Sequence, residues 1–131
     1  MAESADKRVV LIVDDDESIV DLVRACLRER PFNILEAFDG KTGVQRAVES
    51  KADLVILDIM MPVMHGFEAC QALRAKPELK GTKILVLTAK GYETDRRAIL
   101  NLGADEYMVK PVEPKDLLAA VDRLLAGNGK H

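Results

Sequence analysis

Four side chains that could do chemistry stand at the ends of apolar stretches. Asp14 ends "RVVLIVD", Asp58 ends "DLVILD", Thr88 follows "ILVL", and Lys110 follows "EYMV". A carboxylate can act as a nucleophile toward phosphorus. An ammonium group beside it can neutralise phosphoryl oxygens, and a hydroxyl can orient them. The combination therefore suits phosphoryl transfer, provided that the fold brings the four groups together.

The elements that would position these groups are five short strands separated by helices. Five apolar runs, most of them rich in β-branched residues, occupy residues 8–14, 32–38, 53–58, 83–89 and 106–110. Between the runs, apolar residues recur three or four positions apart, which is typical of amphipathic helices. Strands that alternate with helices predict an α/β fold with a parallel sheet covered on both faces.

The carboxyl ends of the strands form the edge where open α/β sheets bind ligands. Four of the five predicted strands deliver a functional group there, whereas the second ends in Phe38 and Asp39 and shows nothing unusual. Carboxylates gathered in a partly dry cleft raise each other's pKa and need a compensating cation. Lys110 would supply one charge, and Mg²⁺, which prefers oxygen ligands, a second. Asp58 is the central acid and so the best candidate nucleophile.

Each of these residues also has a simpler role. Asp16, Glu17 and Ser18 suit a helix N-terminus, where Asp and Ser act as caps and acids are favourable. Thr88 taken alone is an ordinary β-branched strand residue. Lys110 taken alone is a solvated charge. It is the placement of functional groups at four strand ends that favours a site.

Composition indicates one soluble domain. The chain has 131 residues, 48% of them apolar and 31% charged, with a net charge of −3, which predicts no bulk attraction to nucleic acid or membranes. Cys26 and Cys70 fall on apolar helix stripes and are expected to be buried free thiols, as in a reducing cytosol. No signal peptide and no apolar run of membrane-spanning length are visible, so a cytoplasmic location is expected.

Four segments together closely resemble the receiver domain of bacterial two-component response regulators. They are "LIVDDDES", "LVILDIMMPVMHGFE", "ILVLTA" and "GADEYMVKPVEPKDLLAAV". The resemblance extends over residues 7–126, which leaves 1–6 and 127–131 as tails. It implies a flavodoxin-like, doubly wound (βα)5 fold with strand order 2-1-3-4-5, as in the single-domain chemotaxis response regulator.

The resemblance also implies roles for the residues at the strand ends. Asp58 would accept a phosphoryl group from a sensor histidine kinase, a histidine phosphotransfer protein or acetyl phosphate. Asp14, Asp15, Asp58 and the backbone carbonyl of Met60 would bind Mg²⁺, or Mn²⁺ in its place. Such a domain is a regulatory phosphoacceptor rather than an enzyme, although it would catalyse its own phosphorylation and dephosphorylation.

The implied switch involves three further residues. Lys110 would pair with the phosphoryl oxygens, with a cis peptide bond to Pro111. Thr88 would move to the phosphoryl group, and Tyr107 would swing inward behind it. The fourth helix, fifth strand and last helix would then form the face that signals to a downstream protein, near Lys90, Tyr92, Ala104 and Tyr107. Neither nucleic acid nor membrane is an expected partner, and the chain would be a monomer or a phosphorylation-dependent dimer.

Three positions depart from the usual family pattern. His65 stands where an aspartate is common, and we interpret it as an exposed loop variant. Lys90 stands at the edge of the site with an effect of undetermined sign.

Met60, two residues after Asp58, replaces a side chain that is often polar, and its bulk is expected to impede attacking water. A Met60→Asn variant should therefore lose its phosphoryl group faster, and an unchanged lifetime would contradict this interpretation.

Other classes of protein fit less well. A phosphatase of the haloacid dehalogenase type needs a second acid two residues after its nucleophile, where Met60 stands. A flavodoxin-like cofactor binder needs a phosphate loop rich in glycines and hydroxyls after its first strand, where "DDDES" would repel phosphate. A receiver used only for docking would not need the acids, Thr88 and Lys110. The sequence leaves open a single-domain regulator, a phosphorelay intermediate or the N-terminal domain of a longer regulator.

Overall fold

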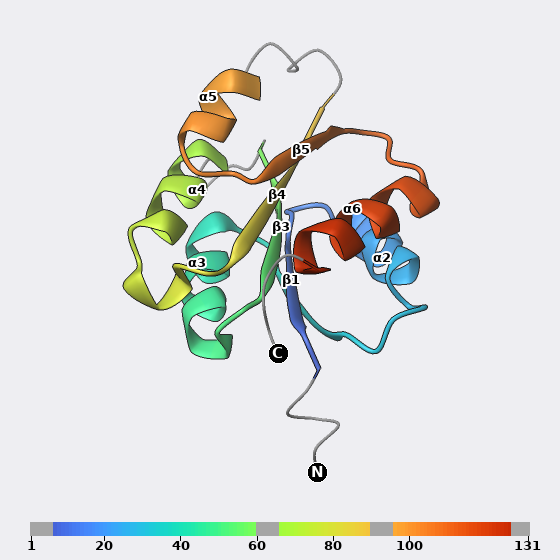
Figure 1. The fold of residues 1–131 in the computed structure, drawn as a ribbon. Helices are drawn as coiled ribbons and strands as arrows, with labels where there is room; N and C mark the ends of the chain where they lie inside the picture. The colour runs from blue at the N-terminus through green and yellow to red at the C-terminus, as the bar shows by residue number, and fades with distance from the viewer. Residues whose placement is uncertain (1–6, 60–65, 90–95, 127–131) are drawn as a thin grey trace.

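The sheet is parallel and five-stranded, as expected. The computed structural model describes residues 7–59, 66–89 and 96–126. The strands have the order β2-β1-β3-β4-β5, so that β1 and β3 lie inside the sheet (Figure 1). Their bounds are β1 (Val9–Val13), β2 (Asn33–Ala37), β3 (Leu54–Asp58), β4 (Lys83–Thr88) and β5 (Glu106–Val109). The doubly wound strand order that the resemblance implied is therefore confirmed.

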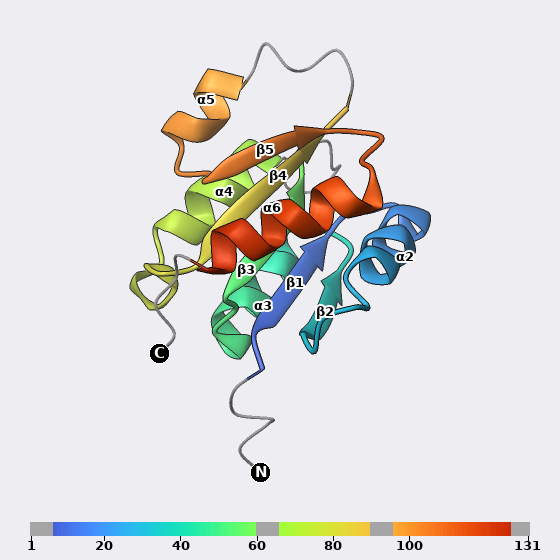
Figure 2. The same ribbon diagram turned by 45° about the vertical axis from the view of Figure 1, so that its right-hand side comes forward.

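Helices cover both faces of this sheet. Buried side chains of α3, α4 and α5 form one core with it, and those of α2 and α6 form a second core on the opposite face (Figures 1 and 2). All five residues of β3 are buried, because central parallel strands are covered on both sides. The helices are α2 (Glu17–Cys26), α3 (Gly40–Ser50), α4 (Gly66–Arg74), α5 (Arg96–Asn101) and α6 (Pro114–Ala126), with a 3-10 turn η1 (Pro77–Leu79).

Local signals in the sequence account for where several helices begin and end. Asp16 caps α2 by accepting a hydrogen bond from the Ser18 backbone N–H at 2.9 Å, which confirms its expected capping role. Asp39 caps α3 through the Thr42 N–H at 2.8 Å. Gly103 follows α5 with φ +111, a conformation that favours glycine. The apolar runs overestimate several strands by a residue or two at their ends, because hydrophobicity does not mark where ladder pairing stops.

The two cysteines lie in the two cores, one on each face of the sheet. Cys26 and Cys70 are buried free thiols, as predicted.

The Arg8 guanidinium donates from Nη1 to the Leu125 carbonyl at 3.2 Å, which ties the start of β1 to the end of α6. Among the described residues, no helix is long and apolar enough to cross a membrane.

The start of α4 lies unusually close to the end of β3. The Gly66 N–H donates to the Ile59 carbonyl at 2.9 Å. A Cβ on Gly66 would lie 2.4 Å from the Ile59 Cα and 2.9 Å from the Asp58 carbonyl oxygen. Only glycine therefore allows the helix to begin so near the strand that carries Asp58.

Arg74 joins three segments at the opposite end of the sheet from the acids. Its guanidinium donates to the Gly103 carbonyl at 2.9 Å, the Leu79 carbonyl at 3.2 Å and the Asp105 carboxylate at 2.8 Å. We expect Arg74→Ala to lower the free energy of unfolding by about 2 kcal/mol in urea denaturation, because partly buried acceptors lose a charged donor. Arg74→Lys should recover only part of this loss, since an ammonium cannot reproduce the fork. Full recovery by lysine would contradict the assignment.

Candidate functional site

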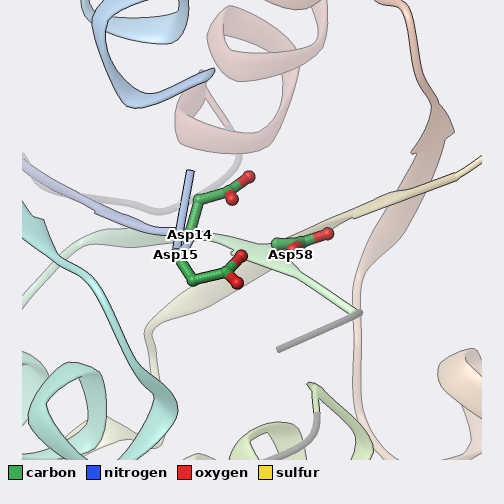
Figure 3. A group of neighbouring side chains, drawn as sticks. All are labelled: Asp14, Asp15 and Asp58. Atoms are coloured by element: carbon green, nitrogen blue, oxygen red, sulfur yellow. The ribbon is translucent and has the colours of Figure 1, made fainter. Parts of the chain in front are cut away.

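Three carboxylates meet where β1 and β3 end. The two strands are paired, with Val13 opposite Leu57, so the residues that follow reach the same edge of the sheet. One carboxylate oxygen from each of Asp14, Asp15 and Asp58 lies within 4.8 Å of the others (Figure 3). The acids that the sequence placed at strand ends are therefore brought together.

Lys110 reaches the same cluster from β5. Its Nζ lies 3.2 Å from Asp14 Oδ2 and 3.1 Å from Asp58 Oδ1. The strand β4 separates β5 from β3, so the lysine side chain crosses the end of β4 to reach these acids. The Lys110–Pro111 peptide bond is cis, as expected. One ammonium thus bridges the two most buried carboxylates of the site.

Burial dominates the electrostatics of the site. Asp14 is 2% exposed, and this burial raises its pKa to about 6, with the charge of Asp58 adding to the rise. The Asp16 N–H, which donates to Asp14 at 3.0 Å, and Lys110 oppose it. The sequence predicted the direction of this shift from mutual repulsion, but desolvation is the larger cause. Burial lowers the pKa of Lys110, yet Asp58 and Asp14 together outweigh it and the pKa is raised, so the lysine is charged.

The charge and chemistry of the cluster fit a divalent cation. Three acidic side chains lie around one ammonium, and a divalent ion would balance the excess of acidic groups. All the donor atoms are hard oxygens of the kind that Mg²⁺ prefers. Asp14 and Asp58 are buried whereas Asp15 is exposed, so the cluster opens to solvent on the Asp15 side.

Thr88 and Tyr107 lie on one face of the sheet beside this cluster. Thr88 is completely buried at the end of β4, and its Oγ1 donates to its neighbour Ala89 at the long distance of 3.4 Å. Tyr107 pairs with Val86 on β4. Because side chains alternate along strands, Val86, Thr88 and Tyr107 all point to the face covered by α5. The hydroxyl and the aromatic ring are therefore neighbours diagonally across two strands.

The structure places only some of the residues that the sequence singled out. Met60 and its carbonyl, His65, Lys90 and Tyr92 lie outside the described residues. Ala104 was expected on a signalling surface, but it is only 7% exposed because it packs into the core under α5. Of the four residues named for that surface, the structure describes Ala104 and Tyr107, and Tyr107 is the one that is partly exposed.

An apolar groove beside the site was not anticipated. It has a volume of about 220 Å³, and Leu22 next to it is 41% exposed. The sequence contained one sign of this groove. Leu22 is apolar, although it lies outside the stripe of α2 residues that enter the core. Lys110 belongs both to the lining of the groove and to the acidic site. Its lining residues are Ile19, Leu22, Val23, Leu87, Ala89, Lys110, Pro111 and Val112.

Comparison with known proteins agrees with this geometry. Residues 10–122 match the response regulator receiver domain family. The chain is 40% identical over 116 residues to the alkaline phosphatase synthesis transcriptional regulatory protein PhoP of Bacillus subtilis, covering 88% of this chain and 48% of that protein. It is 39% identical to the transcriptional regulatory protein GltR of Pseudomonas aeruginosa, covering 93% of this chain and 50% of that one. The chain thus spans about half the length of these relatives.

Solved structures give the same match. The chemotaxis protein CheY4 of Vibrio cholerae superimposes with a TM-score of 0.84 at 34% identity, covering 91% of this chain and 99% of that one. The receiver domain of the sensor histidine kinase PA1611 of Pseudomonas aeruginosa, described with a magnesium ion coordinated in its active site cleft, has a TM-score of 0.84 at 26% identity. It covers 92% of this chain and 99% of that one. Both structures thus match almost the whole of the present chain.

Proposed function

This chain belongs to the response regulator receiver domain family of two-component systems, and we propose from this premise that Asp58 is the phosphoacceptor of a Mg²⁺-dependent switch. The observation that carries the proposal is the Lys110 ammonium held between Asp14 and Asp58 at 3.2 and 3.1 Å. A receiver domain is a regulatory phosphoacceptor domain, and Asp58 is the buried acid at the end of its central strand.

The phosphoryl donor is a phosphohistidine on a kinase or phosphotransfer protein, or a small molecule such as acetyl phosphate. An Asp58 oxygen attacks phosphorus, the bond to the donor atom breaks, and that atom leaves with its electron pair. Lys110 stays charged and neutralises the growing charge on the transferred group. Asp14, Asp15, Asp58 and the Met60 carbonyl would hold Mg²⁺ or Mn²⁺, which would supply further charge neutralisation.

The switch itself rests on residues that gain contacts with the phosphorylated acid. Thr88 and Lys110 are placed to contact the phosphoryl oxygens, so they favour the state that allows both contacts. When Thr88 leaves its position, Tyr107 takes the vacated space from the same face of the sheet. The signal passes to a downstream protein through the face of α5, β5 and α6. The receiver unit comprises residues 7–126 and acts in the cytoplasm.

Intact-protein mass spectrometry tests the proposal. Incubation with acetyl phosphate and Mg²⁺ should add the mass of one phosphoryl group, and peptide mapping should place it on the segment that contains Asp58. Chelation of the divalent ion should prevent the addition, because the three carboxylates would then remain uncompensated. A chain that gains no phosphoryl mass, or gains it elsewhere, would overturn the proposal. The same measurement separates a switch from a receiver that only docks.

The apolar groove suggests where a protein donor docks. A donor must approach Asp58 from the open rim, and the groove continues from Lys110 along α2, so an apolar side chain of the donor would fill it. Leu22→Glu should slow transfer from a phosphorylated histidine donor about tenfold or more, because a charge would enter the contact. Transfer from acetyl phosphate, which is too small to use the groove, should not change.

A matched variant controls for charge. Gln45 is exposed on α3, which covers the opposite face of the sheet from α2. Gln45→Glu adds the same charge as Leu22→Glu and should leave both transfer reactions at the rates of the unmodified protein. Equal slowing of both donors by Leu22→Glu would instead indicate damage to the site and would remove the docking role.

A further inference from the structure

Arg96 contacts the ring of Tyr107. Its guanidinium carbon lies 5.2 Å from the centre of the tyrosine ring. Arg96 is the first residue of α5, and Tyr107 is on β5, the edge strand that this helix packs against. Arginine over an aromatic face is attracted by the ring quadrupole. The contact therefore joins the side chain of Tyr107 to the helix above it.

The contact depends on the position of the tyrosine. Tyr107 is half-buried, with its ring packed on the core side and Arg96 over it. Thr88 lies diagonally across from it on the same face and is completely buried. Arg96, by contrast, is exposed on the first turn of α5, so a ring that entered the buried space of Thr88 would exchange the contact with this exposed guanidinium for contacts in the core. The cation–π contact thus stabilises the half-buried position of the ring that the structure shows.

We infer that Arg96 is a positioning residue that holds Tyr107 in this half-buried position and so restrains the switch. This inference rests on the proposed function, because it assumes that Thr88 and Tyr107 move when Asp58 is phosphorylated. A ligand that favours the inward state must overcome the Arg96 contact as part of its own binding. Loss of a contact of this kind changes such an equilibrium about two- to fivefold.

The inference differs from a general effect of charge near the site. Arg97, the next residue of α5, is also exposed and carries the same charge. Arg96→Gln and Arg97→Gln remove one positive charge each from adjacent positions. Only the first removes the contact with the ring. Arg96→Lys keeps a cation that can still lie over the ring, so it should give an intermediate result.

Two measurements test the inference. The first is the affinity for beryllofluoride, a phosphoryl analogue, in the presence of Mg²⁺. The second is the ¹⁹F spectrum of protein labelled with 3-fluorotyrosine. The chain has two tyrosines, so a Tyr92→Phe background leaves Tyr107 as the only labelled site. Arg96→Gln should bind beryllofluoride about two- to fivefold more tightly. It should also shift the Tyr107 signal of the ligand-free protein toward its position in the beryllofluoride complex.

The outcomes are distinguishable. If Arg96→Gln matches Arg97→Gln in both affinity and ¹⁹F shift while the parent protein binds beryllofluoride, the inference alone is overturned. If the parent protein neither binds beryllofluoride nor takes a phosphoryl group from acetyl phosphate, the proposed function fails together with it. In a Tyr107→Leu background, Arg96→Gln should no longer change the affinity. A persisting change there would show that Arg96 acts on something other than the ring.

Discussion

Asparagine in place of Asp58 is expected to abolish phosphoryl incorporation and at the same time to stabilise the fold. The amide lacks the anionic oxygen that attacks phosphorus, so no covalent product should form with acetyl phosphate and Mg²⁺. The substitution also removes the charge of Asp58, which adds to the rise that burial causes in the pKa of Asp14. Relief of this repulsion should raise the free energy of unfolding by about 1 kcal/mol in the absence of divalent ions.

We expect this gain in the free energy of unfolding because the two buried acids serve the site, whereas their mutual repulsion destabilises the fold. Asp58 is only 4% exposed, and it shares a single ammonium with Asp14. An asparagine carbonyl can still accept from Lys110, so the lysine keeps both neighbours. Addition of Mg²⁺ should stabilise the unmodified protein more than the variant, since the variant has one carboxylate fewer to bind the ion.

Asp21→Asn is the matched control for Asp58→Asn. Asp21 is exposed on α2, and its loss changes the net charge by the same amount. This control should incorporate phosphoryl normally and unfold within about 0.5 kcal/mol of the unmodified protein. Urea denaturation and intact mass report the two effects separately. Phosphoryl mass on the Asp58→Asn protein would mean that another residue accepts the group, and a lower unfolding midpoint would contradict the electrostatic account.

Alanine in place of Gly66 is expected to reduce phosphoryl incorporation on the order of a hundredfold, because displacement of reacting groups by about 1 Å has effects of this size. The new Cβ would lie 2.4 Å from the Ile59 Cα and 2.9 Å from the carbonyl oxygens of Asp58 and Ile59. All three atoms belong to the backbone, which cannot turn aside as a side chain can. The end of β3 must therefore move, and the Asp58 carboxylate moves with it. The unfolding free energy should also fall, by about 3 kcal/mol.

Gly43→Ala offers the same substitution with a different neighbour. A Cβ on Gly43 would meet the Val13 side chain at 2.8 and 2.9 Å, and that side chain can adjust. We expect a smaller loss of stability and a phosphorylation rate close to that of the unmodified protein. Initial rates of phosphoryl incorporation compare the two variants. If Gly66→Ala reacted as fast as Gly43→Ala, the close approach of α4 would not control the position of Asp58.

The fold and the centre of the site could be predicted because both depend on short-range patterns. Continuous apolar runs marked the strands, and parallel strands deliver their carboxyl ends to one edge. Asp14, Asp58 and Lys110 therefore had to be close once the topology was known. The sequence did not show that Lys110 crosses the end of β4 to sit between the two acids, since this depends on side-chain reach rather than on pattern.

Features that depend on contacts between helices and strands could not be predicted. The apolar Leu22 was visible on α2, but the groove itself forms because α2 meets the segment after β5, and no local pattern in the sequence marks that meeting. The Arg96–Tyr107 contact joins residues on two elements whose relative placement is set by packing. The cause of the Asp14 pKa shift was misjudged for the same reason, because burial of a carboxylate is a property of the assembled core.

The contact between Arg8 and the Leu125 carbonyl has a consequence for the connectivity of the domain. It brings the start of β1 and the end of α6 together, at the end of the sheet away from the acids. A short linker could join these ends while the chain is opened at another surface turn. Such a circular permutant would keep every strand pairing and every site residue in place. If the permutant took up a phosphoryl group as the unmodified protein does, the order of the elements along the chain would not decide how the site is assembled.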